Sequence, residues 1–238
     1  MNKLSILYRS CNLEINGNFN VCRPCWFDKR KSFKSFYNSF GDKEGIDIYL
    51  IYDGNENEEL YQYISKFKLK HKYLIFVKNN EKSLLYCYNL MSQLDSEFIA
   101  SFEDDYLWLP NSDKILLEGL EKFNKIATIS LYHHPDRLIR KDDVTWGQEY
   151  IFNTNSCYWR TSESNTATFA ISKELFNKYK QEFINCSIHD RLLFINLLKN
   201  WGLRHLNPIS EKYGCTHVNK FFFSFFIDWE KYNNSIVI

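Results

Sequence analysis

Short apolar runs alternate along the chain with segments in which apolar residues recur at helical spacing. The runs predict buried strands over residues 4–8, 46–52, 73–77, 97–102 and 126–131, because such runs between polar turns are typical of a sheet interior. The periodic segments predict helices near residues 26–40, 57–67, 81–94 and 190–200, and a strand-turn-helix over 167–179. Gly41 and Gly202 are the expected stops of two helices, and Asn57 is an expected cap. This alternation predicts an α/β fold with a mostly parallel central sheet flanked by helices.

Length and charge narrow the class of protein. The 238 residues suit one sizeable domain, and 8 glycines and 4 prolines leave little room for a flexible linker. Lys and Arg (30) nearly balance Asp and Glu (29), so the basic excess of a nucleic-acid binder is missing and a nuclease is disfavoured. No apolar run approaches the roughly 20 residues of a membrane-spanning helix. For the run 221–226, a packed closing segment is favoured over contact with a membrane or a lipid-linked acceptor.

The cysteines point to a reducing compartment. Their number is odd (seven), and no N-terminal signal sequence is recognisable, so we expect a cytoplasmic protein, with peripheral attachment to a membrane as the alternative. Cys22 and Cys25 form a C-x-x-C motif with Cys11 upstream. Because no second pair has zinc-ligand spacing, buried and inert thiols are the expectation.

Polar residues gather where the predicted strands end. Arg9 and Ser10 follow the first strand, Asp53 ends the second, Asn79 follows the third, and the acidic turn 103–105 follows the fourth. Ligands of parallel α/β sheets bind at the carboxyl ends of the strands. The sequence therefore predicts a ligand site at this edge.

The acidic turn, Glu103-Asp104-Asp105, is the strongest chemical signal at that edge. Clustered carboxylates at the tip of a buried strand repel one another and lose solvation unless a cation neutralises them. Oxygen ligands favour Mg²⁺ or Mn²⁺, which proteins commonly share with substrate phosphates. A solvated acidic turn before a helix near Ser112 is the alternative.

The order of these motifs resembles the donor half of GT-A glycosyltransferases, particularly the inverting, family 2-like group. Asn79 stands in the polar turn, Asn89 near the end of the following helix, and residues 98–105 resemble the strand with the family's acidic DxD motif, with Glu103 in place of its first Asp. The resemblance implies that the donor is bound by Tyr8, Arg9, Ser10, Asp53, Asn79, Asn89 and Asp104. It also implies that Glu103 and Asp105 hold Mn²⁺ or Mg²⁺, with His217 as a late ligand.

The resemblance continues into the second half of the chain. Residues 168–173 resemble the strand that enters an acceptor-side helix, and Asp190 stands where the family places its general base. This implies a nucleotide-sugar-binding half over 1–105 and an acceptor-binding half over 106–238. Asp190 as a helix-terminal acid that complements the helix dipole is the alternative, and His189 is an alternative base. A structural role is the alternative for His217.

The sequence thus predicts a metal-dependent glycosyltransferase. It would move a sugar from a nucleotide-diphosphate sugar, with UDP as the expected nucleotide, to a hydroxyl of a glycan, a lipid-linked molecule or a protein, with inversion. Aromatic candidates for stacking on the acceptor, as against anchoring a loop, are Trp146, Tyr158 and Trp159. Candidates for contact with acceptor or phosphate charge, as against solvated surface, are Arg137, Arg140 and Arg160.

Two other classes remain open. A sugar-nucleotidyltransferase also uses a carboxylate-bound metal, but it usually needs a glycine-rich phosphate loop after the first strand, and residues 7–12 contain no glycine. A non-catalytic domain that binds glycans or nucleotide sugars is the second alternative. It becomes the better interpretation if Asp190 is only structural.

Overall fold

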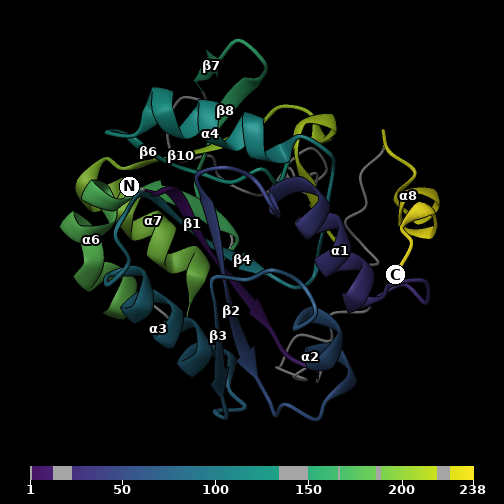
Figure 1. Ribbon diagram of the computed structural model, residues 1–238. Helices are drawn as coiled ribbons and strands as arrows, with labels where there is room; N and C mark the ends of the chain where they lie inside the picture. Colours follow the sequence, from purple (N-terminus) through teal and green to yellow (C-terminus); the bar gives the residue numbers. More distant parts are fainter. Residues whose placement is uncertain (1, 13–22, 134–149, 166, 186–188, 219–225) are drawn as a thin grey trace.

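Nine strands form the central sheet of the protein (Figure 1), and the computed structural model describes residues 2–12, 23–133, 150–165, 167–185, 189–218 and 226–238. The strand order is β3-β2-β1-β4-β9-β6-β10-β8-β7. The strands are β1 (Asn2–Ser10), β2 (Ile46–Asp53), β3 (His71–Ile75), β4 (Ser96–Glu103), β6 (Ala127–Ile129), β7 (Ile151–Asn153), β8 (Tyr158–Ser162), β9 (Phe169–Ser172) and β10 (Arg204–Pro208). Of these nine, β8 and β9 run opposite to the other seven. The predicted mostly parallel sheet is confirmed.

The four parallel strands β3, β2, β1 and β4 place the predicted polar residues at one edge of the sheet. β1 pairs with β2 on one side and β4 on the other, and residues 4–10 are buried. A predominantly apolar run fits this position because both faces of a parallel sheet are covered. Ser10, Asp53 and Glu103 all end their strands here. We call this the carboxyl edge.

β3 begins and ends two residues earlier than the sequence predicts. Asp53 Oδ1 accepts hydrogen bonds from the backbone N–H groups of Val77 (2.9 Å) and Lys78 (3.0 Å). Because these two N–H groups donate to the Asp53 side chain, they do not form backbone hydrogen bonds between β2 and β3, and β3 stops at Ile75. The predicted span 73–77 was wrong at both ends.

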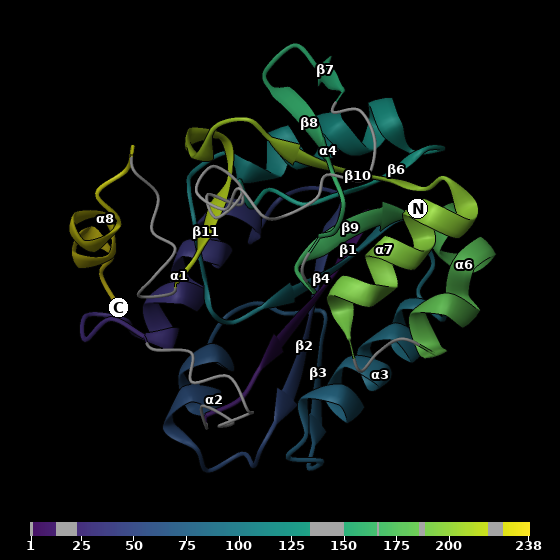
Figure 2. The same cartoon turned by 180° about the vertical axis from the view of Figure 1, so that it is seen from behind.

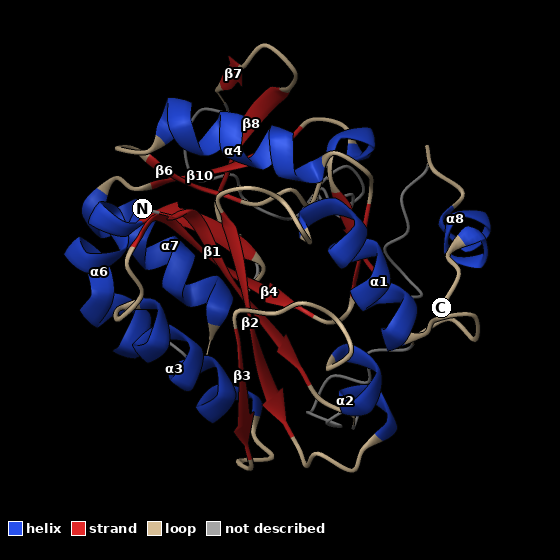
Figure 3. Ribbon diagram, in the orientation of Figure 1, coloured by secondary structure: helices blue, strands red, loops and turns tan. Residues whose placement is uncertain are grey.

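Helices cover both faces of the sheet (Figures 1 and 3). One face carries α1 (Lys29–Phe40), α2 (Glu59–Ile64) and α4 (Ser112–Phe123), whose apolar side chains share one core cluster. The other face carries α3 (Asn80–Met91), α6 (Lys173–Asn185) and α7 (Asp190–Trp201), which share a second cluster. Gly41 ends α1 and Gly202 ends α7, as predicted. Gly202 adopts a left-handed conformation (φ 67°), which is common at the end of a helix.

The start of α2 differs from the prediction. Its N-cap is Glu58, which makes no side-chain cap hydrogen bond. The backbone N–H of Asn57 instead donates to Oδ1 of Asn55 at 3.0 Å. This contact is an Asx turn made by the Asn55 side chain, and it places Asn57 in the turn before the helix and not at its cap.

Several short elements were not predicted, and one pair of them shapes the site. β5 (Tyr106–Trp108) and β11 (Cys215–His217) form a separate antiparallel pair that sets His217 opposite Tyr106. Gly214 precedes β11, and a Cβ there would lie 2.3 Å from the backbone oxygen of Leu131, so a larger residue would displace the strand. A third apolar cluster packs α8 (Trp229–Ser235) against this pair. Figure 2 shows α8 and β11 from behind.

Two further expectations concern membranes and thiols. No helix in the described part of the chain is long and apolar enough to cross a membrane. Of the run 221–226, residues 221–225 lie outside the described residues. Cys87, Cys157 and Cys215 are buried free thiols as expected, whereas Cys25 is exposed. Cys22 lies outside the described residues.

Candidate functional site

Each carboxylate of the acidic turn is bound to a cationic side chain of the protein itself. Glu103 ends β4, and the turn leads directly into β5. The three acids point in different directions, and each meets a different cation. The pairs, measured from side-chain nitrogen to carboxylate oxygen, are Arg9–Glu103 (2.6 Å), Lys29–Asp104 (3.0 Å) and Arg23–Asp105 (2.6 Å). The chain therefore supplies much of the neutralising charge that the sequence assigned to a metal ion.

Glu103 and Arg9 lie on the face of the sheet that α3 covers. Arg9 Nη2 donates to Glu103 Oε1, and Nη1 donates to Oδ1 of Asn80 at 3.2 Å, at the first turn of α3. The Arg9 side chain is 6% exposed. Burial lowers the pKa of Arg9, but the Glu103 carboxylate outweighs this effect and the pKa rises. The two residues form a buried ion pair that joins β1, β4 and α3.

Asp104 lies on the opposite face, beside the start of α1. Its Oδ2 accepts hydrogen bonds from the Ser10 hydroxyl (2.9 Å), the Cys11 backbone N–H (3.1 Å) and Lys29 Nζ. Burial raises the pKa of the Cys11 thiol to about 11, and the charge of Asp104 adds to this, so the thiol stays protonated at neutral pH. Asp104 thus holds the end of β1 to the start of α1.

Asp105 meets His217 across the β5–β11 pair. Asp105 Oδ2 lies 2.9 Å from His217 Nε2 and accepts a hydrogen bond from Arg23 Nη2, while Arg23 Nη1 lies 3.2 Å from the same His217 nitrogen. Burial raises the pKa of Asp105, but the contacts with His217 and Arg23 hold it well below its usual range. The carboxylate stays ionised throughout the neutral and mildly acidic range.

Replacing Asp105 with asparagine should lower the stability of the fold by about 1–3 kcal/mol at pH 7, because Arg23 loses the carboxylate with which it is paired. Since the folded-state pKa lies below the ordinary 3.8, this stabilisation is present above about pH 4 and is lost as the pH falls further. Urea unfolding of both proteins between pH 7 and pH 3 should show free energies that converge at the acid end. Asp95→Asn, which changes an exposed carboxylate before β4, is the control. A stability difference that stays constant down to pH 3 would contradict the coupling.

The other predicted donor-binding residues have local structural contacts. Tyr8 is buried in the core against Phe36 of α1, where burial and the charge of Asp104 raise its pKa well above the ordinary value. Asn79 caps α3 by accepting from the Lys82 backbone N–H at 2.9 Å. Asn89 is exposed near the far end of α3 and donates to the Leu85 carbonyl at 3.0 Å. The structure does not bring Asn89 to the carboxyl edge.

Asp53 is tied to the turn after β3 through one oxygen. As noted for β3, its Oδ1 accepts two backbone N–H groups. Its Oδ2 is buried and has no hydrogen-bond partner among the described residues. A buried unpaired carboxylate oxygen at the carboxyl edge can accept a hydrogen bond from a ligand. The predicted role of Asp53 in donor binding stays a prediction.

The predicted metal ligands do not form one ligand set. Asp105 and His217 adjoin each other, and Asp105 Oδ1 is buried without a partner among the described side chains, but Glu103 lies with Arg9 on the other face. Among the described residues, no group of three or more His, Cys, Asp and Glu is arranged to hold a metal ion. The side chains present therefore do not fit the predicted three-residue site for Mn²⁺ or Mg²⁺.

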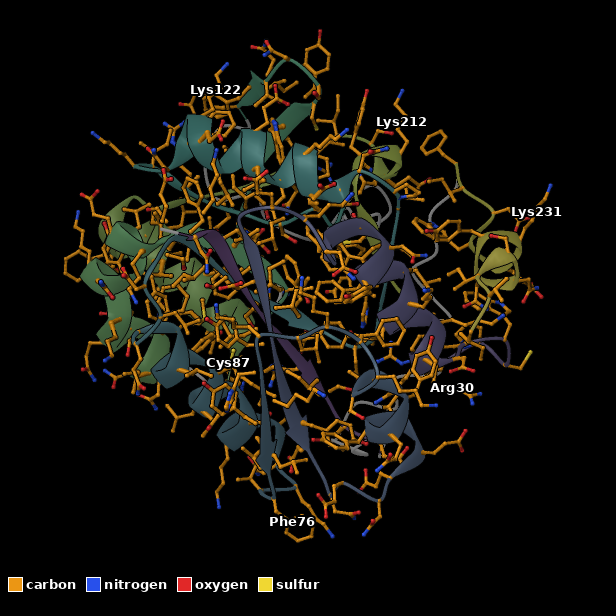
Figure 4. All side chains as sticks on the ribbon, in the orientation of Figure 1. Arg30, Phe76, Cys87, Lys122, Lys212 and Lys231 are labelled. Carbon is orange, nitrogen blue, oxygen red and sulfur yellow. The ribbon has the colours of Figure 1, made fainter. Side chains whose placement is uncertain are left out.

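A cavity of about 300 Å³ opens beside Lys29, the cation that is paired with Asp104. It lies between the end of β1 and the first turns of α1 and α2, and Figure 4 shows Arg30 between these two helices. Its lining residues are Asn12, Phe27, Asp28, Lys29, Arg30, Glu59 and Leu60. Lys29 belongs both to this lining and to the Asp104 pair. The cavity is large enough for part of a small-molecule ligand.

The site residues predicted in the second half of the chain lie on different elements. α7 begins at Asp190 and leads into β10, which runs parallel to β6, so α7 starts on the side of the carboxyl edge. His189 is exposed as the N-cap of α7 and makes no side-chain cap bond. Arg160 Nη2 donates to the backbone carbonyl of His133 at 2.6 Å. Trp146, Arg137 and Arg140 lie outside the described residues.

Of the aromatic candidates, Trp159 is a core residue. It is fully buried against Phe123 of α4, and a Cβ on Gly119 would come within 2.8 Å of its ring. Stacking of Trp159 on an acceptor sugar was therefore wrong. Tyr158, its neighbour on β8, faces outward and is 57% exposed.

The residues that the sequence analysis missed come from the segment between β1 and α1. Arg23, Lys29 and Phe27 all precede or open α1, and the motif prediction stopped at Ser10. A basic cluster at residues 29–31, directly after the first strand's loop, was the available signal. Such a loop reaches the carboxyl edge in any parallel α/β sheet.

Comparisons with known proteins show the fold. No protein-family model matches the sequence, and no curated protein matches it. The crystal structure of Staphylococcus aureus TarS 1–349 matches with a TM-score of 0.56 and 11% identity, over 91% of this chain and 60% of that one. A protein of Desulfovibrio desulfuricans G20, assigned as a nucleotide-diphospho-sugar transferase, matches with a TM-score of 0.51 and 9% identity, over 87% of this chain and 80% of that one.

The chain has a GT-A-like fold. The fold that the order of motifs implied is thus confirmed, including the strand that carries the acidic turn. Because the chain spans about 60% of the TarS fragment, the activity of that longer protein does not transfer with the fold.

Proposed function

We propose that this GT-A-like chain is a glycosyltransferase that takes its sugar from a nucleotide-diphosphate sugar, with UDP as the expected nucleotide. The observation that carries the proposal is the meeting of a cavity with two fixed cations at the carboxyl edge: Lys29 lines the cavity, and Arg23 lies on the ring of Phe27, which also lines it. Crevices at this edge are the usual ligand sites of parallel α/β sheets. The fold likeness to an assigned nucleotide-diphospho-sugar transferase supports the same class.

In the proposed reaction, the bond between the anomeric carbon and the diphosphate oxygen breaks as the acceptor oxygen forms its bond to that carbon from the opposite face. The acceptor hydroxyl loses its proton to a general base, for which Asp190 at the start of α7 is the candidate. The nucleoside diphosphate leaves with the bonding electrons. Positive charge from Arg23 and Lys29 stabilises the departing anion. Inversion follows if Asp190 lies opposite the leaving group.

The two halves of the chain would divide the substrates as the sequence implied. The cavity and its cations come from residues before 105, which we propose as the nucleotide-sugar-binding half. Exposed Tyr158 on β8 is the remaining aromatic candidate for contact with the acceptor. Glycans, lipid-linked molecules and proteins all stay open as acceptors, and a need for Mn²⁺ or Mg²⁺ stays a prediction.

Thermal unfolding in the presence of nucleotides tests the proposal. One nucleoside diphosphate or its sugar, at about 100 times its Kd, should stabilise the fold by about 2.7 kcal/mol, because only the folded chain binds it. For a domain of this size that is about 5–10 °C. The panel contains UDP, GDP, CDP, ADP and the common UDP-sugars, each with EDTA and with Mn²⁺, and inorganic diphosphate as the control. If no nucleotide shifts the transition in either buffer, the proposed function is wrong.

Turnover separates the enzyme from its rivals. A glycosyltransferase hydrolyses or transfers the sugar of a bound donor and releases the nucleoside diphosphate. A nucleotidyltransferase instead releases inorganic diphosphate from a nucleoside triphosphate and a sugar phosphate. Binding of the donor without turnover would favour the non-catalytic domain.

A further inference from the structure

Asp105 and His217 are the two predicted metal ligands that the structure brings together, and Arg23 lies against both. Arg23 Nη2 is 2.6 Å from Asp105 Oδ2, and Nη1 is 3.2 Å from His217 Nε2. Asp105 Oδ2 and His217 Nε2 are themselves 2.9 Å apart. An ion bound to both would occupy the space next to the guanidinium, and two like charges at such a distance repel strongly in a partly buried site.

The position of Arg23 is held by contacts besides Asp105. Its Nη1 also donates to the backbone carbonyl of Val218, and its guanidinium lies over the ring of Phe27, 5.5 Å from the centroid. The backbone N–H of Val218 in turn donates to the Asp105 carbonyl at 2.8 Å. The Arg23 side chain is 15% exposed. The guanidinium is thus held by the Asp105 carboxylate, the Val218 carbonyl and the Phe27 ring, so its positive charge keeps a fixed position, as that of a bound ion would.

Lys29 provides a second fixed cation on the cavity side. It contacts Asp104 Oδ2 at 3.0 Å and the Cys11 backbone carbonyl at 2.8 Å, and its side chain is 16% exposed. Burial lowers the pKa of Lys29, but Asp104 raises it by more, so the ammonium stays charged. Arg23 and Lys29 thus lie on neighbouring carboxylates at the carboxyl edge, and Phe27 connects Arg23 to the cavity lining.

We propose that Arg23, with Lys29, takes the place of the divalent ion in this chain, so that the diphosphate of the donor binds without a metal. This inference rests on the proposed function. A nucleoside diphosphate in the cavity would meet charge that the fold has already paired and oriented, and a guanidinium suits the planar fork geometry of phosphate oxygens. Asp105 then orients Arg23 and is a positioning residue.

Calorimetric titration of the full chain with UDP, GDP, CDP and ADP, in EDTA and in Mn²⁺, tests the inference. The wild type should bind one of them with a Kd that agrees within about twofold in the two buffers, since a site without an ion has no linkage to Mn²⁺. Arg23→Gln should weaken that binding in EDTA by about 10-fold to 100-fold, because charged hydrogen bonds are the strong ones. Arg23→Lys should recover part of the loss.

A control variant and a direct measurement of free Mn²⁺ accompany the titration. Arg204→Gln removes an arginine that lies over Tyr150, away from the cavity, and should leave the Kd unchanged. In parallel, the electron paramagnetic resonance signal of free Mn²⁺ should be no lower with wild-type protein and the nucleotide together than with the same nucleotide alone, because the diphosphate itself binds Mn²⁺ in solution. This readout needs no activity and no folded variant.

The possible results separate the inference about Arg23 from the proposed function. Three results would overturn the inference and leave the proposed function standing: binding only in Mn²⁺, a free Mn²⁺ signal that is lower with wild type and nucleotide than with nucleotide alone, or Arg23→Gln binding as tightly as the wild type in EDTA. No nucleotide binding in either buffer would overturn both. Metal-independent binding that depends on Arg23 would establish the inference.

Discussion

Replacing Arg9 with methionine is expected to destabilise the fold by about 3 kcal/mol, because it removes the guanidinium that pairs with the Glu103 carboxylate beneath α3. The loss is set toward the lower end of the range for broken buried pairs because Glu103 is 23% exposed and keeps some solvation. Asn80 also loses its contact with the guanidinium. Chemical denaturation at pH 7 measures the difference in unfolding free energy.

The double variant Arg9→Met/Glu103→Gln separates a missing pair from a missing side chain. Since both charges are then gone, it should recover most of the stability that the single variant loses. Lys3→Met removes another lysine or arginine of β1, but its partner Glu121 is exposed, so we expect a change of at most about 1 kcal/mol. If Arg9→Met is as mild as Lys3→Met, the acidic turn does not need this counter-charge and our account of it is wrong.

Replacing Asp190 with asparagine should reduce sugar transfer by about 10²-fold to 10⁴-fold, the usual contribution of a general base. Binding of the nucleotide should stay as in the wild type, because the cavity lining comes from the first half of the chain. Initial rates with a saturating donor, together with the Kd of the nucleoside diphosphate, measure the two effects.

Glu174→Gln is the matched control for Asp190→Asn. Glu174 lies in the first turn of α6, so its loss also removes an acid from a helix N-terminus, at a cost of a few tenths of a kcal/mol to about 1 kcal/mol. Turnover should not change. Asp190→Asn activity within a few-fold of the wild type would mean that Asp190 only complements the dipole of α7, and the base would then have to be sought elsewhere, with His189 the first candidate.

Much of the architecture could be read from short-range patterns. The runs that became β1, β2 and β4 are predominantly apolar because both of their faces are covered, and that signal needs no knowledge of their partners. The helical spacing of Phe33, Phe36 and Phe40 and the stop at Gly41 predicted α1 in the same way. The positions of Ser10, Asp53 and Glu103 at one edge then follow from parallel pairing alone.

What could not be read is which partner each polar side chain takes. Glu103, Asp104 and Asp105 are adjacent in the chain, yet their cations come from residues 9, 29 and 23, and His217 reaches Asp105 only through the short β5–β11 pair. These contacts depend on a loop and on strands of three residues, which carry almost no local pattern. Local periodicity therefore predicts an acidic turn at the carboxyl edge of the sheet. Only the tertiary structure determines that side chains of the protein neutralise this turn, because residues remote in sequence meet only when the sheet has formed.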